Sequence, residues 1–289
     1  MNHDLTFYGT GAAQAIPSPF CTCRVCQNAR EKGGREIRRR SMFRISEEMC
    51  IDLGPDAVAQ AISFGDLTQL RHVLVTHMHL DHFSYGVMEV RRLSHEGGDW
   101  PLHYYLTDKA YEAVKMFMTD SFVKELTEKM LQKGIVEFHR LEYGKTSAIS
   151  NTEVTPLQGN HHGQIGENSA NYLLRLPNGK KLYYGLDTGW YLDETLDALR
   201  GVELDYLVSE CTFGLTPERE GVQPEHLHAA ACERLFKVLA EQGTITDKTH
   251  IYLTHINHNT STGAELEEWL KTREFPCQVT VAYDGMQIS

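Results

Sequence analysis

Hydrophobic residues along the chain fall mainly into short runs that end in polar or charged residues. Residues 72–76, with the sequence HVLVT, form an apolar run typical of a buried strand. Similar short runs predict further strands at 5–8, 42–45, 49–53, 102–106, 153–157, 181–185, 206–208 and 251–253. Helices are expected at 57–62, 85–93 and 108–131. Strands and helices mixed in this way indicate an α/β protein.

The predicted helix over 108–131 carries apolar side chains along one face. They recur at helical spacing and are Ala110, Val114, Phe117, Met118, Phe122, Leu126 and Met130. A stripe of this kind is typical of a helix that packs against its own domain. Because layered α/β folds reach this length around one core, we expect a single domain that spans residues 1–289.

A dense group of metal-binding residue types begins where the strand over 72–76 ends. In the sequence THMHLDH, His77 and His79 alternate with apolar residues, so an extended segment points both imidazoles the same way. Asp81 and His82 then turn toward a second point. Neutral imidazoles and carboxylates are ligands that suit zinc, manganese or iron. The spacing therefore predicts two neighbouring metal centres.

Later strands are followed by the same residue types, in the sequences NHH, LDTG, SECT and THINH. The His-x-His-x-Asp-His sequence resembles the signature of the metallo-β-lactamase superfamily, and the later HH, LDTG and LTH sequences recur in the order of that family. This resemblance extends over most of the chain. It implies a four-layer αββα metallo-β-lactamase sandwich with a dinuclear metal site.

The same resemblance implies a role for each ligand position. The first metal would be held by His77, His79 and His161, the second by Asp81, His82 and His255, with Asp187 as the bridge. A carboxylate suits the bridge because its two oxygens can be shared between cations about 3.5–4 Å apart. His162 stands beside His161 and is the alternative ligand, although VTPLQGNH resembles the phosphodiesterase stretch that ends at His161.

Three of the seven cysteines crowd into the sequence CTCRVC, as Cys21, Cys23 and Cys26. Their spacing fits a metal site better than a disulfide framework in a chain of this size. Three sulfurs and the nitrogen of His258, three residues beyond His255, would form a closed tetrahedral site for one structural zinc. The sequence thus predicts an N-terminal zinc-knot loop at about 17–30.

The zinc-knot loop, together with the late sequences LTHINH and YDGMQI, resembles the accessory phosphodiesterase subfamily of the carbon-phosphorus lyase pathway. A relative from pyrroloquinoline-quinone biosynthesis has a similar knot, so the structural zinc does not fix the substrate. Residues 83–150 depart from the subfamily pattern. We expect a larger helical insertion over that segment.

The expected metals indicate a hydrolytic mechanism. Two divalent ions, zinc or manganese and alternatively iron, would lower the pKa of a shared water, so that a bound hydroxide attacks the substrate. His226 resembles the histidine that heads the corresponding helix in phosphodiesterases of the superfamily and would protonate the leaving group, with His228 as the alternative. Glu210 would orient His226. Asp81 and His226 are therefore the expected catalytic residues.

We expect a phosphodiesterase that acts on a small or cyclic ribose or nucleotide phosphodiester. The alternative enzyme is a lactone or lactam hydrolase, and the alternative without turnover is a metal-dependent cofactor-binding or carrier protein of the quinone-biosynthesis type. A net charge of −11 disfavours bulk nucleic acid as a partner, because such binding depends on basic side chains. The expected partner is a small phosphorylated substrate, and a homodimer is left open.

Hydropathy and runs of charged residues indicate where the protein is located and suggest one further candidate contact. No apolar run approaches the roughly 20 residues of a membrane span, and the N-terminus lacks a signal-peptide pattern. We therefore expect a cytoplasmic protein without a membrane partner. The run Arg38–Arg40 is expected to form a solvated face, although it is also a candidate phosphate contact. Histidines outside the motifs are given no function; they include His72, His103, His139 and His250.

Overall fold

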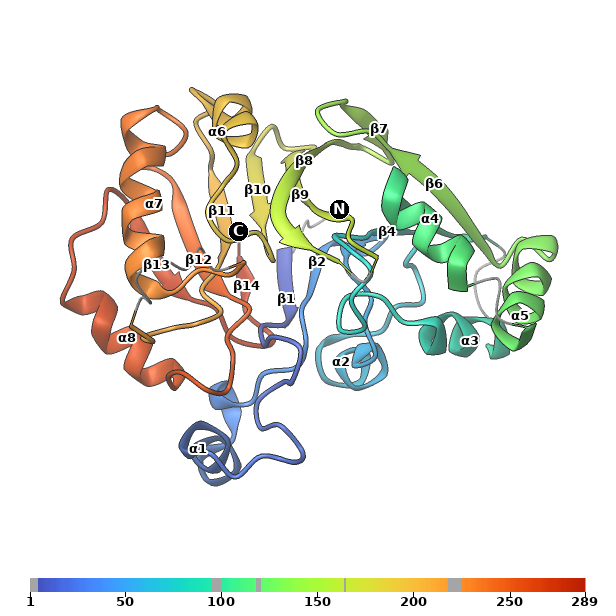
Figure 1. Cartoon of the computed structure of the whole chain (residues 1–289), viewed down its shortest axis with the longest axis horizontal. Coiled ribbons are helices and arrows are strands. Elements are labelled where there is room, and N and C mark those ends of the chain that lie inside the picture. Colours follow the sequence, from blue (N-terminus) through green and yellow to red (C-terminus); the bar gives the residue numbers. More distant parts are fainter. Residues whose placement is uncertain (1–4, 95–99, 118–120, 164, 218–224, 289) are drawn as a thin grey trace.

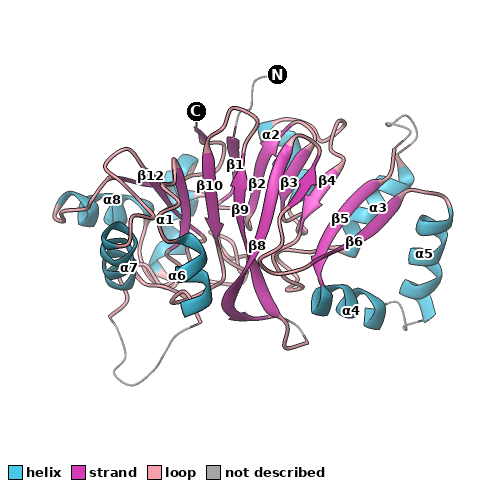
Figure 2. Ribbon diagram, turned by 90° about the horizontal axis from the view of Figure 1, so that it is seen from above, coloured by secondary structure: helices cyan, strands magenta, loops and turns pink. Residues whose placement is uncertain are grey.

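Two facing sheets form the centre of the protein (Figure 2). The computed structural model describes residues 5–94, 100–117, 121–163, 165–217 and 225–288, and within them each sheet has seven strands. The first sheet has the order β14 (Gln287–Ile288), β1 (Leu5–Gly9), β2 (Met42–Ser46), β3 (Met49–Ile51), β4 (His72–Leu74), β5 (Leu102–Thr107) and β6 (Val136–Leu141). The second has the order β13 (Gln278–Val281), β12 (His250–Thr254), β11 (Tyr206–Glu210), β10 (Lys181–Gly185), β9 (Asn168–Arg175), β8 (Thr152–His162) and β7 (Ser147–Ile149).

Helices lie outside the two sheets (Figure 1). On the side of the first sheet they are α2 (Ala57–Phe64), α3 (Tyr85–Leu93), α4 (Asp108–Phe117) and α5 (Ser121–Gln132). On the side of the second sheet they are α6 (Asp193–Leu199), α7 (Ala229–Glu241) and α8 (Gly263–Lys271). The N-terminal part contributes α1 (Arg24–Lys32) and the 3₁₀ turn η1 (Gly34–Glu36). Each helix of the described residues is too short or too polar to cross a membrane.

Three layers of buried apolar side chains hold these elements together. Between the sheets, the Phe43 ring lies 4.8 Å from that of Phe7 and 5.6 Å from that of Tyr184, measured between centroids. A second cluster joins α7, through residues such as Phe236, to the outer face of the second sheet. A third joins the helices α2, α3 and α4 to the outer face of the first sheet, through residues such as Met88. The αββα sandwich expected from the sequence is confirmed.

The prediction of one continuous helix over 108–131 is wrong. The structure has two helices, α4 and α5, which run in clearly different directions (Figure 2). Thr119, Asp120 and Ser121 have side chains that favour the start of a helix over its interior, which is a local signal against one continuous helix. Among the predicted stripe residues, Ala110, Val114 and Met130 are buried and Leu126 packs against them. Met118 and the side chains of Phe117 and Phe122 lie outside the described residues.

The segments predicted as a helical insertion and as a loop have more regular structure than expected. Residues 83–150 contain α3, α4 and α5, but also β5, β6 and β7. Because β5 and β6 are parallel neighbours, their connection must cross over, and α4 and α5 form that crossover. The zinc-knot loop at 17–30 leads into α1, which places Cys26 on a helix. Both segments therefore extend the fold with regular elements.

The candidate site residues lie at or just beyond the ends of strands, in one region of the fold. In the second sheet β10, β11 and β12 are parallel, so their carboxyl ends meet at one edge, where Asp187, Glu210 and His255 lie. The loop after β4 of the first sheet carries His77 through His82. The strand predicted at 153–157 is longer than expected and includes His161, because β8 continues through a register irregularity between Gln158 and His162.

Candidate metal centres

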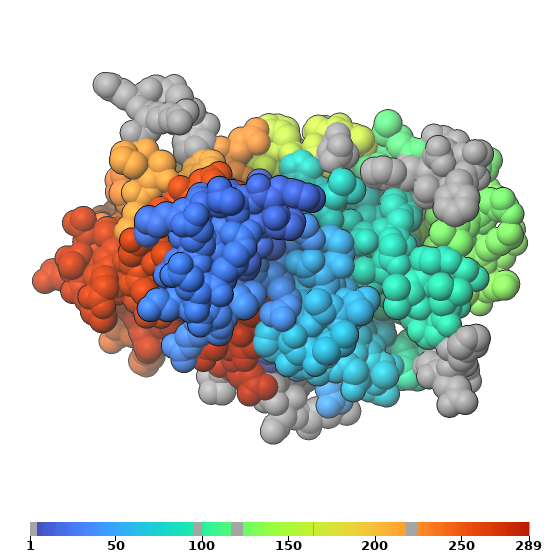
Figure 3. Space-filling model, turned by 90° about the horizontal axis from the view of Figure 1, so that it is seen from below, coloured from blue at the N-terminus to red at the C-terminus, as the bar shows by residue number. Residues whose placement is uncertain are grey.

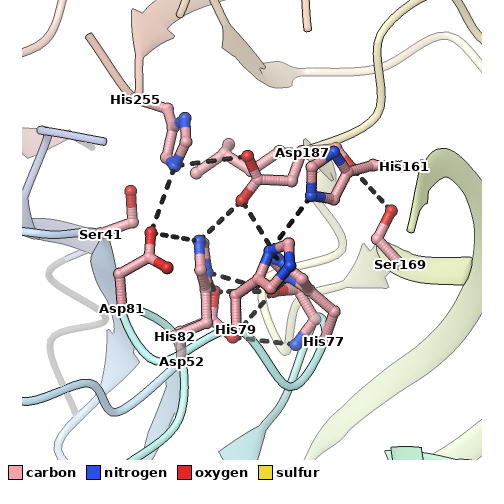
Figure 4. A network of polar contacts seen from close by, with 12 residues as sticks. Ser41, Asp52, His77, His79, Asp81, His82, His161, Ser169, Asp187 and His255 are labelled. Atoms are coloured by element: carbon pink, nitrogen blue, oxygen red, sulfur yellow. Dashed lines mark hydrogen bonds and ion pairs between the residues drawn. The ribbon is translucent and has the colours of Figure 1, made fainter. Parts of the chain in front are cut away.

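The loop after β4 and the end of β8 form a first group of imidazoles (Figure 4). The Nδ1 atom of His79 lies 2.8 Å from Nε2 of His77 and 3.2 Å from Nε2 of His161. His77 is fully buried, and burial lowers the pKa of its imidazole well below the ordinary value. A neutral imidazole is the form that binds a metal. The three ring nitrogens that converge here can thus serve as ligands of one cation.

A second group forms beside the first, with Asp187 between them (Figure 4). The Oδ2 atom of Asp81 lies 3.1 Å from Nε2 of His82 and 3.9 Å from Nε2 of His255. Asp187 points one oxygen, Oδ1, at His255 over 3.4 Å and the other, Oδ2, at His82 over 2.7 Å and at His77 over 3.9 Å. Asp187 therefore faces members of both groups, as a bridging carboxylate must.

These donor sets fit divalent cations. Nε2 of His82, Nε2 of His255 and Oδ2 of Asp187 are buried, yet within the described structure they have no hydrogen-bond partner of acceptable geometry. A buried polar atom without a partner is costly, and a cation coordinated by these atoms removes that cost. Imidazole and carboxylate donors suit zinc, manganese and iron. The residues present are thus compatible with bound divalent cations.

Buried side chains behind the ligands fix the direction of their rings. Nδ1 of His82 donates to the Asp52 carboxylate over 2.6 Å, and Asp52 also accepts from the Thr76 amide over 2.8 Å. Nδ1 of His255 lies 2.9 Å from the Thr212 hydroxyl, which donates to Glu210 over 2.6 Å. In each case the second nitrogen, Nε2, is left facing the site. Partners of this kind hold the tautomer and orientation of metal-binding histidines.

The metal-binding loop also depends on a glycine, Gly54. A Cβ atom at Gly54 would lie 2.0 Å from the carbonyl oxygen of Asp81, so an added methyl group must displace the loop backbone. We expect Gly54→Ala to lose metal at the candidate dinuclear site and to lower the unfolding midpoint, because the ligand spacing depends on this close contact. Metal analysis by mass spectrometry and thermal unfolding measure both effects.

Gly86→Ala is the matched control for that variant. Gly86 is exposed on helix α3, where a Cβ atom would meet only the Ser84 hydroxyl at 3.4 Å. Alanine in place of glycine within a helix is expected to leave metal content unchanged and to stabilise by up to about 1 kcal/mol. Equal metal content in Gly54→Ala and Gly86→Ala would show that the close contact does not set the ligand geometry.

Glu167 is a further buried residue that supports the loop. Its carboxylate accepts from the backbone amide of Met78 over 3.1 Å and from that of Ile165 over 2.9 Å. The first of these contacts ties the loop between His77 and His79 to the residue that precedes β9 in the second sheet. Sequence inspection missed Asp52 and Glu167, because an isolated acidic residue near a strand end carries no signal of its own.

The two adjacent histidines on β8 have different surroundings. His161 is buried, and its ring lies 5.1 Å from those of both His77 and His79 between centroids. His162 is exposed, with Nδ1 facing the Glu225 carboxylate over 3.3 Å. Consecutive residues of a strand point to opposite faces, which explains the difference. The geometry therefore places His161, and not His162, with the first group of imidazoles.

His226 lies beside the two groups without belonging to either. Its Nδ1 atom is 3.0 Å from Glu210 Oε2 and 3.3 Å from Asp187 Oδ1. Burial lowers the pKa of His226, but the Glu210 and Asp187 carboxylates outweigh it and raise that pKa to about 9. Glu210 is itself fixed by the amides of Thr188 and Gly189 at 2.7 and 2.9 Å. The arrangement places the His226 imidazole next to the two groups of candidate ligands, beside carboxylates that favour its protonated form.

His228, the alternative proton donor, has a different role. It is buried at the N-cap of α7, where its Nδ1 atom accepts from the Ala231 amide over 3.1 Å. An N-cap acceptor satisfies a helix amide that otherwise lacks an intrahelical partner. The described contacts of His228 thus stabilise the helix start, while His226 faces the site.

The cysteines of the zinc-knot segment meet His258 at a separate place. Nδ1 of His258 lies 3.5 Å from Sγ of both Cys23 and Cys26, and the donor atoms of these residues and Cys21 lie within 4.8 Å of one another. Burial raises the pKa of Cys23, but hydrogen bonds from the Cys26 amide and His258 outweigh it and lower that pKa to about 6. The three cysteines are free and not joined in disulfides. Three sulfurs and one nitrogen fit structural zinc.

This cysteine cluster joins distant parts of the chain. Figure 3 shows the N-terminal segment in blue packed against the C-terminal part in red. Arg30 holds the loop itself, because its guanidinium donates to the carbonyls of Cys21 and Ser18, each over 2.8 Å. Since His258 follows the candidate ligand His255 by three residues, a zinc at the cluster would brace one side of the candidate dinuclear site.

The arginine run is not one solvated face, contrary to the expectation from its charge. Arg38 is buried and donates to the Thr10 hydroxyl over 2.9 Å and to the Ala282 carbonyl over 2.6 Å. Arg39 pairs with Asp284 at 3.4 Å, and Arg40 pairs with Asp56 at 2.8 Å. Consecutive residues of an extended segment point to different sides, so each guanidinium finds a separate internal partner.

Comparison with solved structures defines the class of fold. A diphosphatase from the PhnP family superposes with a TM-score of 0.71 at 23% identity, over 99% of this chain and 97% of that one. Zinc-bound PqqB from Methylobacterium extorquens gives 0.72 at 17% identity, over 99% of each chain. The short form of human tRNase Z gives 0.62 at 17% identity, over 99% of this chain and 98% of that one. These structures share the metallo-β-lactamase fold.

The family follows from the sequence match. The β-lactamase superfamily domain matches residues 48–256, most of the chain. None of the curated proteins that were compared matches the sequence. The protein belongs to the β-lactamase superfamily, whose metallo-β-lactamase fold implies a divalent-metal hydrolase site of the kind assembled at Asp187.

Proposed function

We propose that the protein is a dinuclear metal-dependent phosphodiesterase that cleaves a small or cyclic ribose or nucleotide phosphodiester. One observation carries this proposal: His226, outside both ligand groups, is held by buried Glu210 and lies 3.3 Å from the bridging carboxylate of Asp187. A phosphodiester with a sugar leaving group needs a proton at the departing oxygen, and His226 is placed to supply it.

The ligand groups define where cations would bind. His77, His79 and His161 would hold one, Asp81, His82 and His255 the other, and Asp187 would face both. Cations held by these residues would supply a water of lowered pKa and positive charge for the phosphoryl oxygens. Zinc, manganese and iron suit the donors, and Cys21, Cys23, Cys26 and His258 would hold a separate structural zinc.

The protein's own residues orient the ligand imidazoles and protonate the leaving oxygen. Asp52 and Thr212 keep the free nitrogens of His82 and His255 directed at the substrate side. Because Nδ1 of His226 faces Glu210, Nε2 is the ring nitrogen that would donate to the leaving oxygen. The buried Glu210 carboxylate stabilises the imidazolium before the proton is transferred. Proton donation of this kind contributes about 10²–10⁴-fold to rate.

Similar proteins and overall charge support a small phosphorus-containing substrate. Two of the similar structures are named a diphosphatase and a tRNase, enzymes whose names describe cleavage at phosphorus. The net charge of −11 repels an extended polyanion, since binding to nucleic acid relies on many basic contacts. A small phosphodiester needs only the local positive charge of the bound cations.

A panel of substrates tests the proposal. We expect protein loaded with manganese or zinc to hydrolyse bis(p-nitrophenyl) phosphate and a nucleoside 2′,3′-cyclic phosphate faster than an oligonucleotide. Asp81→Ala should abolish this turnover, because it removes a carboxylate that faces both His82 and His255. Colorimetric and chromatographic rates measure the effect.

The same panel separates the alternatives. Turnover of a lactone or lactam with no reaction at any phosphodiester would identify the other class of hydrolase. No turnover of any substrate by fully metal-loaded protein would favour a metal-dependent cofactor-binding or carrier protein. Either result would overturn the proposed function.

A further inference from the structure

A third set of ligand-type side chains lies in the first sheet, away from the sites described above. His103 of β5 is the direct strand partner of Glu137 of β6, and His139 follows two residues later, opposite Tyr105. Alternate residues of a strand share a face, so His103, Glu137 and His139 project from the same face of the sheet. They lie toward the amino-terminal half of these strands, whereas the dinuclear ligands follow the carboxyl end of β4.

Three donor atoms of this set converge to the spacing of a metal site. Nδ1 of His103 lies 2.9 Å from Nε2 of His139 and 3.3 Å from Oε2 of Glu137, and the latter two atoms are 3.7 Å apart. A point equidistant from the three atoms is about 1.9 Å from each, so a cation slightly out of their plane reaches the roughly 2.0–2.2 Å of zinc–nitrogen and zinc–oxygen bonds.

Neighbouring rings hold this arrangement while leaving it open to solvent. The Tyr105 ring stacks on His139 with centroids 4.9 Å apart, and the His72 ring stacks on His103 at 5.4 Å. The side chains of His103, His139 and Glu137 remain 24%, 37% and 49% exposed, respectively. A cation can therefore enter from solvent, and water can take a fourth coordination position.

We propose that His103, Glu137 and His139 bind a zinc ion, independently of the dinuclear and cysteine sites. Two imidazoles and one carboxylate are ligands that zinc favours, and three donors with one open position match its tetrahedral preference. The ion joins β5 to β6, two strands that are adjacent in space but separated in sequence by the crossover through α4 and α5. Its expected effect is to stabilise this outer part of the sheet.

Zinc binding to the holoprotein tests this site. Protein that already contains its resident metals is dialysed against micromolar free zinc, and the zinc content is compared between wild type, Glu137→Gln and His139→Gln. We expect the wild type to take up one more zinc per chain than either variant, with affinity in the variants at least about 100-fold weaker. His250→Gln is the control, since His250 lies in the second sheet with Thr280 and Tyr252 as its partners.

A second measurement guards against misfolded variants. Glu137 is half exposed, so Glu137→Gln holoprotein that contains its resident metals is expected to unfold at the wild-type temperature when no further zinc is added. Added zinc should then raise the unfolding midpoint of wild type and His250→Gln, but not that of Glu137→Gln. Equal zinc content, or an equal zinc-dependent shift, in wild type and Glu137→Gln overturns the proposal. Neither readout depends on hydrolase activity, so the proposed function is tested separately.

Discussion

Replacing Asp187 by asparagine is expected to lower phosphodiester turnover by about 10³-fold or more, since the metals proposed to bind beside it would supply several kcal/mol of transition-state stabilisation. The amide keeps the shape of the carboxylate but loses the charge that Nε2 of His82 and Nε2 of His255 face at 2.7 and 3.4 Å. Metal content should fall in parallel. Steady-state kinetics and metal analysis of the same preparation measure both quantities.

The fold should tolerate this change. Asp187 has φ 48°, a left-handed conformation that asparagine adopts more readily than most residues. Asp197→Asn is the matched control, because Asp197 is 72% exposed on α6 and pairs only with Arg200 among its described contacts. Asp197→Asn should keep full activity. A fully active, metal-replete Asp187→Asn would contradict the bridging role.

His226→Gln should produce a loss that depends on the leaving group. For a nucleoside cyclic phosphate, whose departing alkoxide needs a proton, we expect kcat to fall by about 10²–10⁴-fold. For bis(p-nitrophenyl) phosphate, whose phenolate departs without protonation, the loss should be less than about tenfold. Comparing kcat for the two substrates isolates proton transfer from binding and folding.

His162→Gln provides the control for that variant. His162 lies on the same strand as His161 but is 55% exposed and faces Glu225, so its removal should leave both rates unchanged. An equal loss for both substrates in His226→Gln would mean that His226 acts by holding Asp187, which it approaches at 3.3 Å, and not by donating a proton.

The sequence predicted those features that are encoded locally. The run HVLVT and the spacing of His77, His79, Asp81 and His82 lie within eleven consecutive residues, 72–82. Both the strand β4 and the cluster of ligand types that follows it are visible without any knowledge of distant partners. The later HH, LDTG and LTH sequences occur in the order of the metallo-β-lactamase superfamily, and that resemblance predicted the fold.

Features that depend on distant contacts were not predicted. Asp52 precedes Thr76 by 24 positions, yet it accepts hydrogen bonds from both Thr76 and His82 because β3 and β4 are parallel neighbours. The requirement for Gly54 arises from the carbonyl of Asp81, which approaches it only in the folded loop. Such partners follow from strand register, which a single sequence does not determine.

The proposed zinc site in the first sheet shows the same limit more clearly. His103 and His139 are separated by 36 residues and the crossover between them, and each taken alone is an ordinary strand histidine. Only the parallel pairing of β5 with β6 places their ring nitrogens 2.9 Å apart. Strand β6 itself was missed, because polar Glu137 and His139 occupy positions where a buried strand would have apolar residues.

Anomalous diffraction from crystals of the purified protein tests the central claim most directly. Data collected above and below the absorption edges of zinc, manganese and iron locate each bound metal. We expect two peaks about 3.5–4 Å apart on either side of the Asp187 carboxylate, one among His77, His79 and His161 and one among Asp81, His82 and His255. A single peak, or peaks remote from Asp187 in fully metal-loaded crystals, would contradict a dinuclear centre.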